Sequence, residues 1–288
     1  MKIPFVKMHG AGNDYIYFDC MKTPAEQIFS DISAAAVRLS DRHKGIGGDG
    51  VVLICKSDVA DAQMRMFNAD GSEGKMCGNA IRCVGKYLYD SGATDKLRLK
   101  IQTLAGIKEL YLHAESGSVT TVTVDMGRAE LNPELIPVAV AGGRCIDRPV
   151  EVGGRAWRIN AVSMGNPHCV IFADPDTTDV ETVGKLFENA PIFPDRVNTE
   201  FIKVIGKNKL KMRVWERGSG ETMACGTGAC AAAVAAVECG FADAKEEITV
   251  LLRGGELTIR YCDERVLMTG AAELVFAGVL ETEGDCKL

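Results

Sequence analysis

Two cysteines stand in matching sequence settings and could act together as acid–base groups. Cys77 is followed by Gly78 and Cys225 by Gly226, each at the end of a loop of small residues. Inverting a carbon centre means removing a proton from one face and returning another to the opposite face, which needs one deprotonated and one protonated group of similar basicity. A thiolate and a thiol meet this need, because an unperturbed thiol has a pKa of about 8.5. The pair predicts stereoinversion at a carbon acid.

A helix is expected directly after each of these cysteines. After Cys77, apolar residues recur at helical spacing over 81–88. After Cys225, the alanine-rich run 229–237 is a strong helix former that Gly240 can end. That second helix has almost no polar face, so it should be buried against closely approaching strands.

The start of a helix is a favourable place for such a sulfur. Its unpaired backbone N–H groups and partial positive charge favour a thiolate and attract a carboxylate. We therefore expect both thiol pKa values to be lowered. Gly78 and Gly226 would let a ligand carboxylate approach the backbone without a side chain in the way.

An internal repeat divides the chain. A Gly-Asn pair before an apolar run, a small-residue loop before Cys-Gly, and a glycine between two strand-like segments each occur twice, in the same order and about 150 residues apart. The paired positions are Asn13 with Asn166, Cys77 with Cys225, and Gly106 with Gly255. Three ordered matches at nearly constant separation indicate two homologous halves.

Each half is predicted to be rich in strands. Short segments of β-branched and aromatic residues, bounded by Gly, Asn or Asp, are typical of strands. They occur at 15–20, 51–55, 97–103, 108–113 and 119–126, then at 168–173, 200–205, 210–215, 247–252 and 256–261. Besides the two helices after the cysteines, helices are expected at about 24–40 and 178–189.

These elements predict an α/β (α+β) fold of two pseudo-symmetric halves. Each half would be a curved, mainly antiparallel sheet wrapped around one central helix. The N-terminal half would comprise 1–122 plus 271–288 and carry Cys77, and the C-terminal half would comprise 123–270 and carry Cys225. We expect the chain to cross near 114–130, its last strand to return to the first half, and the active site to lie in the cleft between the halves.

Composition favours a small-molecule substrate. The net charge is -6 with a pI near 5.4, and no run of Lys or Arg provides a footprint for nucleic acid or an anionic membrane. The N-terminus lacks a secretory signal pattern and no segment approaches the length of a membrane span, so a cytoplasmic protein is expected.

Eleven cysteines in such a chain favour thiols in a reducing compartment over a disulfide framework. No C-x2-C pair occurs and the four histidines are scattered, so no metal site is expected. Apart from the two proposed acid–base cysteines, the rest are predicted to pack as small apolar residues. They are Cys20, Cys55, Cys83, Cys145, Cys169, Cys230, Cys239, Cys262 and Cys286.

Over essentially its full length the chain resembles the diaminopimelate epimerases. The matching motifs are Met8–Asp14, Arg42–Gly47, Asn68–Ser72, Cys77–Asn79, Gly165–His168, Val197-Asn198, Glu216–Gly218 and Cys225-Gly226. The resemblance implies interconversion of LL- and meso-diaminopimelate, in lysine and peptidoglycan precursor synthesis, without pyridoxal phosphate, metal or other cofactor. It also implies the family's pseudo-symmetric fold and a homodimer.

The resemblance assigns a role to each matching residue. Cys77 and Cys225 would be the acid–base pair, and His168 and Glu216 would tune their basicity. Arg217 would clamp the distal carboxylate, with Glu216 also among the binding residues. Backbone donors would come from Gly78-Asn79 and Gly226-Thr227, and the substrate-binding amides would be Asn13, Asn68, Asn166 and Asn198.

Taken singly, these residues have plainer interpretations. An Asn after Gly is commonly a turn residue, a lone Arg a solvated surface residue, and a lone His or Glu an ordinary polar residue. Some family members carry Gln where this chain has Gly50, so only a backbone contact could be made there. Two other functions stay open: a two-cysteine racemase of the proline or hydroxyproline type, and a thiol redox or metal-binding protein. The racemase is disfavoured because a cyclic imino acid offers no second end for Arg217 and the asparagines to hold.

Overall fold

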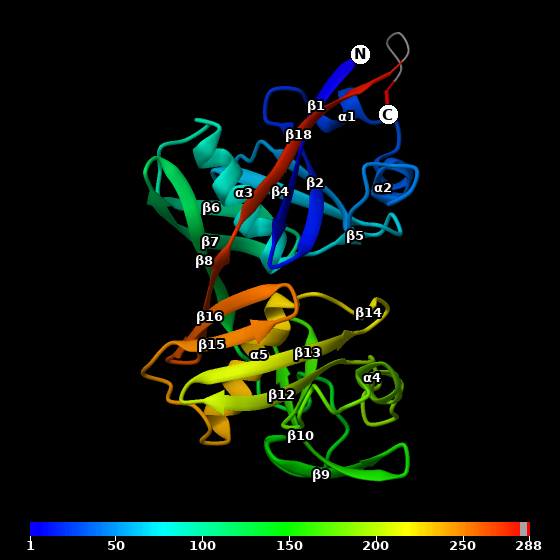
Figure 1. Cartoon of the computed structure of the whole chain (residues 1–288), viewed down its shortest axis with the longest axis vertical. Coiled ribbons are helices and arrows are strands. Elements are labelled where there is room, and N and C mark those ends of the chain that lie inside the picture. Colours follow the sequence, from blue (N-terminus) through cyan, green and yellow to red (C-terminus); the bar gives the residue numbers. More distant parts are fainter. Residues whose placement is uncertain (283–286) are drawn as a thin grey trace. The chain divides into compact units, whose positions relative to one another are not determined.

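The computed structural model describes residues 1–282 and 287–288 and divides the chain into two compact units (Figure 1). The first unit comprises Met1–Val124 together with Gly270–Leu288, and the second comprises Asp125–Thr269. Both combine many strands with few helices, which confirms the predicted mixed α/β class. Cys286, which was expected to pack in the core, lies outside the described residues.

Apart from a short helix and the last strand in the first unit, and the first strand in the second, the elements follow one another in the same order in the two units. The first unit contains β1 (Lys2–Gly10), β2 (Asn13–Cys20), α1 (Ala25–Ile28), α2 (Ile32–Ser40), β3 (Gly50–Cys55), β4 (Ala62–Asn68), β5 (Glu73–Gly74), α3 (Gly78–Asp90), β6 (Arg98–Thr103), β7 (Gly106–Glu115), most of β8 (Ser118–Arg128), and β18 (Glu273–Glu281). The second contains β9 (Arg148–Val152), β10 (Arg155–Ser163), β11 (Pro167–Ile171), α4 (Val180–Glu188), β12 (Asn198–Gly206), β13 (Lys209–Glu216), β14 (Gly220–Glu221), α5 (Gly226–Glu238), β15 (Ile248–Leu252), β16 (Gly255–Cys262), and most of β17 (Arg265–Ala271).

The strand pairings of the first unit recur in the second. In the first, β1–β2 is antiparallel, β2–β3 parallel, β3–β4 antiparallel, β4–β6 parallel and β6–β7 antiparallel. The series β10–β11, β11–β12, β12–β13, β13–β15 and β15–β16 has the same alternation. Two segments of similar sequence pattern have therefore folded into the same topology.

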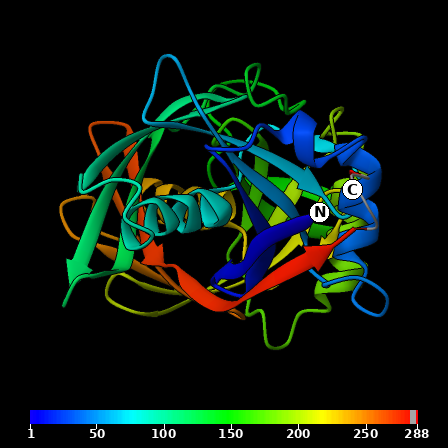
Figure 2. The same ribbon diagram turned by 90° about the horizontal axis from the view of Figure 1, so that it is seen from above.

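Each unit curves its sheet around one helix. The helix α3 contacts β1, β2 and β7, and α5 contacts β10 to β13 as well as β15 and β16. A flat sheet could not reach a single helix from so many strands, so each sheet must bend. Figure 2 shows strands of the first unit around α3. The predicted curved sheet around a central helix is confirmed.

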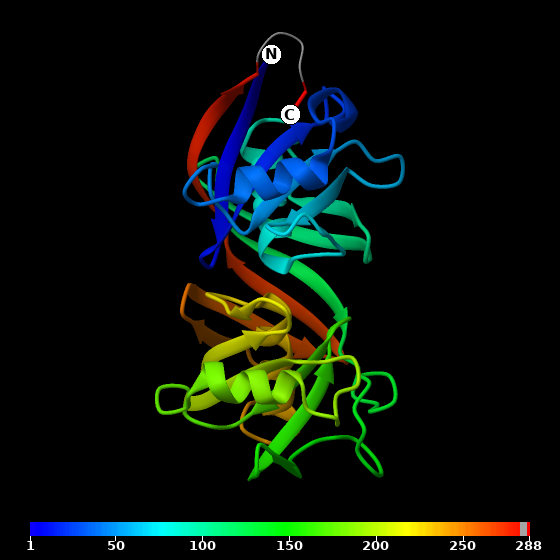
Figure 3. The same cartoon turned by 90° about the vertical axis from the view of Figure 1, so that its right-hand side faces the viewer.

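A second helix covers the other face of each sheet (Figure 3). In the first unit, Ile16 and Phe18 of β2 join Val51 and Leu53 of β3 in an apolar cluster with α2. The alternate residue Tyr17 faces the opposite way and donates a hydrogen bond to the Ala80 carbonyl of α3, at 3.4 Å. Strands buried on both faces are continuously apolar, which is why these two were readily recognised.

The alanine-rich helix α5 is almost completely enclosed. Its residues from Gly228 to Ala236 are all buried. Small side chains let surrounding strands come close to the helix axis, whereas a helix with a polar face would have to leave that face in water. The predicted burial is confirmed, and Gly240, with a positive φ of 75°, follows the helix end as expected.

The prediction of a single helix over 24–40 is wrong. It is interrupted at Phe29, whose backbone is extended, and restarts at Ile32. Asp31 caps the restarted helix by accepting a hydrogen bond from the Ala34 N–H. The break is also held by the chain end, since Ser30 N–H donates to the Leu288 carbonyl and Leu288 N–H donates to the Ile28 carbonyl. That long-range pairing is invisible in the local sequence pattern.

Several strands were not predicted, including β1, β4 and β10. Strand β4 relies on Met64 and Met66, which lack the branched side chains typical of strands. Strand β1 carries Lys7 at a buried position, which breaks its apolar pattern. Lys7 is tolerated there because its ammonium lies 2.7 Å from the Asp14 carboxylate on β2. Within the described residues, no helix is both long and apolar enough to cross a membrane.

The packing of α4 on β13 yields a stability prediction. An added Cβ at Gly184 would lie 2.4 Å from Trp215 Cβ and 2.5 Å from its Cγ. Gly184→Ala should therefore lower the free energy of unfolding by about 1–3 kcal/mol through overpacking, despite the better helix propensity of alanine. Urea denaturation would measure this. Gly206→Ala, where the nearest atom lies 3.8 Å from the new Cβ, is the matched control, and equal stability of the two variants would contradict the prediction.

Candidate active site

Cys77 caps the N-terminus of α3. Its backbone is extended, with φ -132° and ψ 120°, and the helix begins at the next residue, Gly78. The Cys77 sulfur accepts a hydrogen bond from the Ala80 N–H at 3.5 Å. The Cys77 sulfur therefore lies at the start of a helix, as predicted.

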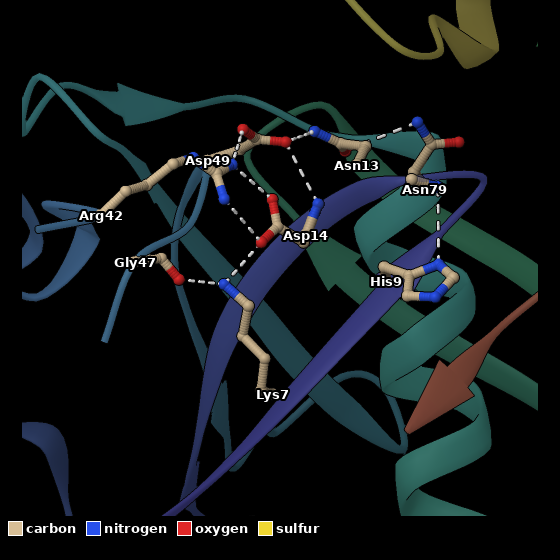
Figure 4. Close-up of polar contacts among 9 residues, drawn as sticks. Lys7, His9, Asn13, Asp14, Arg42, Gly47, Asp49 and Asn79 are labelled. Carbon is tan, nitrogen blue, oxygen red and sulfur yellow. Dashed lines mark hydrogen bonds and ion pairs between the residues drawn. The ribbon is translucent and has the colours of Figure 1, made fainter. Parts of the chain in front are cut away.

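Two of the predicted binding asparagines lie beside this sulfur. Cys77 Sγ is 3.3 Å from Asn13 Oδ1, and Asn79 Nδ2 is 3.4 Å from the same oxygen. Asn13 is the first residue of β2, and Asn79 lies in the first turn of α3. Figure 4 shows the two amides next to each other.

Asn68 and Gly50 lie opposite each other at the ends of β4 and β3. Asn68 donates its amide to Ser72 Oγ at 3.0 Å, so its contact is within its own loop. A Cβ at Gly50 would lie 2.1 Å from the Phe67 carbonyl oxygen and 2.8 Å from the Tyr15 ring. The backbone at Gly50 therefore has no room for a side chain. The close pairing of β3 with β4 explains why this chain has glycine where some family members carry Gln.

Cys225 occupies the equivalent position in the second unit. It caps α5, with φ -117° and ψ 111°, and its sulfur accepts a hydrogen bond from Gly228 N–H at 3.4 Å. The Thr227 hydroxyl is 3.5 Å from that sulfur. Cys225 is buried, and Gly228 is required beside it, because a Cβ there would lie 2.6 Å from Glu200 Oε1.

A chain of polar contacts leads from Thr227 into the core. Asn166 Nδ2 donates to Thr227 Oγ1 at 3.4 Å, and Asn166 Oδ1 lies 3.1 Å from His168 Nε2. His168 Nδ1 lies 2.7 Å from Glu200 Oε1, and both of these side chains are fully buried. Glu200 therefore orients the His168 imidazole, and the imidazole in turn orients the Asn166 amide.

The expected lowering of the Cys225 pKa is wrong. Burial raises the pKa of this thiol well above its ordinary value, and the nearby carboxylates of Glu216 and Glu200 raise it further. The hydrogen bonds from Thr227 and Gly228 act in the opposite direction but are outweighed. A helix N-terminus contributes only about half a charge, which is too little against desolvation and two anions.

Glu216 adjoins this sulfur at the end of β13. Burial raises the pKa of its carboxyl group above the ordinary value, against the hydrogen bonds from Thr222 and Cys225 that lower it. The Thr222 hydroxyl donates to Glu216 Oε1 at 2.5 Å.

Asn198 and Arg217 form a separate contact pair. Asn198 Oδ1 accepts a hydrogen bond from Arg217 N–H at 2.9 Å, and its amide nitrogen donates to the Pro167 carbonyl at 3.2 Å. Asn198 therefore fixes the backbone that carries Arg217. One guanidinium nitrogen of Arg217 donates to the Asp195 carbonyl at 2.7 Å, which uses one of the five N–H donors of the group.

Three residues with contacts to these groups were not singled out from the sequence. Asp49 accepts from Asn13, Glu200 from His168, and Thr222 donates to Glu216. Glu200 is the one acid in a strand segment rich in apolar residues and was a usable signal, whereas nothing in the local pattern points to Thr222. Within residues 1–282 and 287–288, no group of three or more His, Cys, Asp and Glu side chains could hold a metal ion.

Comparison with known proteins decides the family. The model of the family described as "Diaminopimelate epimerase" matches residues 5–132 and 160–275. The chain belongs to the diaminopimelate epimerase family. Membership makes the protein an enzyme of the isomerase class, and more specifically an epimerase.

Relatives in this epimerase family are similar over nearly the whole chain. The diaminopimelate epimerase of Agathobacter rectalis is 49% identical over 287 residues, which covers 96% of this chain and 99% of that protein. The diaminopimelate epimerase of Pelotomaculum thermopropionicum is 50% identical over 276 residues, covering 95% and 97%. The resemblance found in the sequence motifs is thus confirmed.

Solved structures of other enzymes share the fold of this epimerase-family chain. A hydroxyproline epimerase from Agrobacterium vitis superposes with a TM-score of 0.69, covering 97% of this chain and 91% of that one, at 13% identity. A likeness at such low identity shows the fold alone. The proline or hydroxyproline alternative is accordingly not favoured over the family given by the closely similar sequences.

The charge of Glu216 next to Cys225 allows a test of the thiol pKa. Because the carboxylate raises that pKa, the neutral side chain in Glu216→Gln should lower it. The midpoint of a pH series of iodoacetamide alkylation, followed by mass spectrometry of the Cys225 peptide, should move to lower pH. Glu246→Gln, at an exposed ion pair with Lys207, is the matched control. An unchanged or higher midpoint in Glu216→Gln would contradict the assignment.

Proposed function

We propose that this protein interconverts LL- and meso-diaminopimelate by a two-base inversion that uses Cys77 and Cys225 and no cofactor. The observation that supports it is that both cysteines cap the central helix of their unit, at equivalent positions of a repeated topology. Family membership supplies the substrate. The two sulfurs would act from opposite faces of one α-carbon.

The proton balance of the reaction follows from this arrangement. A thiolate on one side takes the α-proton and becomes a thiol, while the thiol on the other side gives its proton to the opposite face and becomes a thiolate. The reverse reaction exchanges these roles. Burial and two carboxylates raise the pKa of Cys225, which favours the thiol form of this side chain.

The charge that develops during the reaction would be held by the two helix starts. Proton removal moves negative charge onto the α-carboxylate, and N–H groups that point out of a helix N-terminus stabilise such charge. Gly78-Asn79 and Gly226-Thr227 supply these donors at α3 and α5. The same donors bind the substrate before reaction, so they orient the α-carbon as well.

Amides and one arginine would recognise the rest of the substrate. Asn13, Asn68, Asn166 and Asn198 can donate to carboxylate and accept from ammonium, and Arg217 can clamp the distal carboxylate bidentately. His168 would act on Cys225 through Asn166 and Thr227, and Glu216 acts on it directly. Proline has no second amino-carboxylate end for these groups, which favours diaminopimelate.

Replacing either cysteine tests the mechanism. Cys77→Ala and Cys225→Ala should each lower kcat for inversion by about 100-fold or more, because general acid–base catalysis contributes that much. The assay is incubation with LL-diaminopimelate in deuterated water without added cofactor, following inversion and α-deuterium together. Cys262→Ala removes an exposed thiol and is the control. Retained inversion in either active-site variant, or wild-type turnover of proline but not diaminopimelate, would refute the proposal.

We propose that the protein works in the cytoplasm. Diaminopimelate serves lysine and peptidoglycan precursor synthesis, and a mechanism that uses two thiols suits the reducing cytoplasm.

We also propose that the protein is a homodimer. Four apolar side chains of β18 are 45–56% exposed, namely Leu274, Val275, Phe276 and Val279. Clustered apolar exposure of this kind is typical of an interaction surface, and a second copy would cover it. Sedimentation should give a dimer for the wild type and a monomer for Val275→Asp/Val279→Asp, two substitutions within this exposed apolar segment of β18. A wild-type monomer at micromolar concentration would rule this out.

A further inference from the structure

An acidic residue outside the proposed acid–base pair contacts the Asn13 amide (Figure 4). Asp49 Oδ2 accepts a hydrogen bond from Asn13 Nδ2 at 2.6 Å and another from Asp14 N–H at 3.1 Å. Asp49 Oδ1 accepts from Arg42 Nη2 at 3.0 Å. Both carboxylate oxygens are therefore engaged, one by the amide and one by the guanidinium.

These contacts determine which way the Asn13 amide faces. An amide has a donor end and an acceptor end, whereas a carboxylate only accepts. The NH2 end of Asn13 must therefore face Asp49. The oxygen end then faces Cys77 Sγ at 3.3 Å and Asn79 Nδ2 at 3.4 Å.

Asp49 is itself held firmly. Its N–H donates to the Asp14 carbonyl at 2.7 Å, and Ala69 N–H donates to the Asp49 carbonyl at 3.0 Å. Arg42 bridges Asp49 to Asp14, which it contacts with both terminal nitrogens, at 2.7 and 3.2 Å. The cation and the two anions form one network, so the carboxylate cannot turn away from Asn13 without breaking several bonds.

A buried lysine fixes the loop that carries Asp49. Lys7 Nζ lies 2.7 Å from Asp14 Oδ2 and also donates to the Gly47 carbonyl. Gly48 lets this happen, because a Cβ there would lie 2.6 Å from Lys7 Nζ. The motif Arg42–Gly47, which sequence analysis matched to the family without a role, is thus part of the support for the Asn13 amide.

We propose that Asp49 is a positioning residue that presents the oxygen of the Asn13 amide, and not its nitrogen, to the Cys77 sulfur. An oxygen there accepts the S–H proton and orients the thiol, whereas an NH2 group would donate to the thiolate and make it a weaker base. The inference rests on the proposed role of Cys77 as an acid–base group.

A double-mutant cycle tests this coupling. Asp49→Asn places an NH2 group within the network, so the Asn13 amide loses its fixed orientation, and kcat/KM should fall by about 10- to 100-fold through misplacement at the reacting centre. If Asp49 acts through Asn13, then Asp49→Asn should cause no further loss of kcat/KM in an Asn13→Ala background. Independent, multiplicative losses would overturn the proposal, and so would wild-type kcat/KM in Asp49→Asn.

Controls separate positioning from folding and from the proposed function. Asp41→Asn makes the same change at an exposed acid in the same loop, where Asp41 accepts from His43 and Lys44 N–H, and it should retain wild-type kcat/KM. Melting temperatures of all variants identify losses due to unfolding. If Asp49→Asn does not fold, Asp49→Ser carries the same cycle. An inactive wild type would refute the proposed function, whereas an active wild type with multiplicative losses refutes only the role of Asp49.

Discussion

Both parts of the candidate site depend on one constraint: a cysteine must cap a helix that the sheet encloses. Cys77 and Cys225 each accept a hydrogen bond from the N–H three residues further along, as Ser or Asp does at an ordinary helix start. Because α3 and α5 each contact several strands of their own sheet, the backbone of each capping cysteine is fixed relative to the core. The scaffold therefore places the Cα atom of each proposed acid–base cysteine, and the buried alanines of α5 and the curvature of each sheet contribute to that placement.

The same position has different electrostatic surroundings in the two units. Beside Cys225 stand Glu216 and Glu200, and their charge together with burial raises the pKa of that thiol. Beside Cys77 stands the Asn13 amide, which in turn contacts the Asn79 amide. A repeated topology has thus kept the geometry of the cap and changed the charges around it.

The features that depend on local pattern could be predicted from the sequence. The helices after Cys77 and Cys225, their ends, and the strands β2 and β3 follow from periodicity, glycine placement and continuous apolar runs. What it missed depends on contacts between distant residues. The break at Phe29 involves the chain end, and β1 accommodates Lys7 only because Asp14 lies opposite. The predicted lowering of the Cys225 pKa was wrong for the same reason, since Glu200 approaches the sulfur only after β12 and α5 have packed together.

The two asparagines at equivalent repeat positions show how such distant contacts fix function-bearing groups. Asn13 is held by Asp49, so its oxygen meets the sulfur directly. The Asn166 oxygen is occupied by His168, so its nitrogen meets Thr227, whose hydroxyl meets Cys225. An amide can serve either way, and only its partner decides which end is offered. Residue type and spacing therefore identify the asparagines, but the acids Asp49 and Glu200 behind them determine which end of each amide is presented. The proposed two-base inversion depends on this choice, because a sulfur that must both take and give a proton is affected in opposite directions by a donor and by an acceptor at its side.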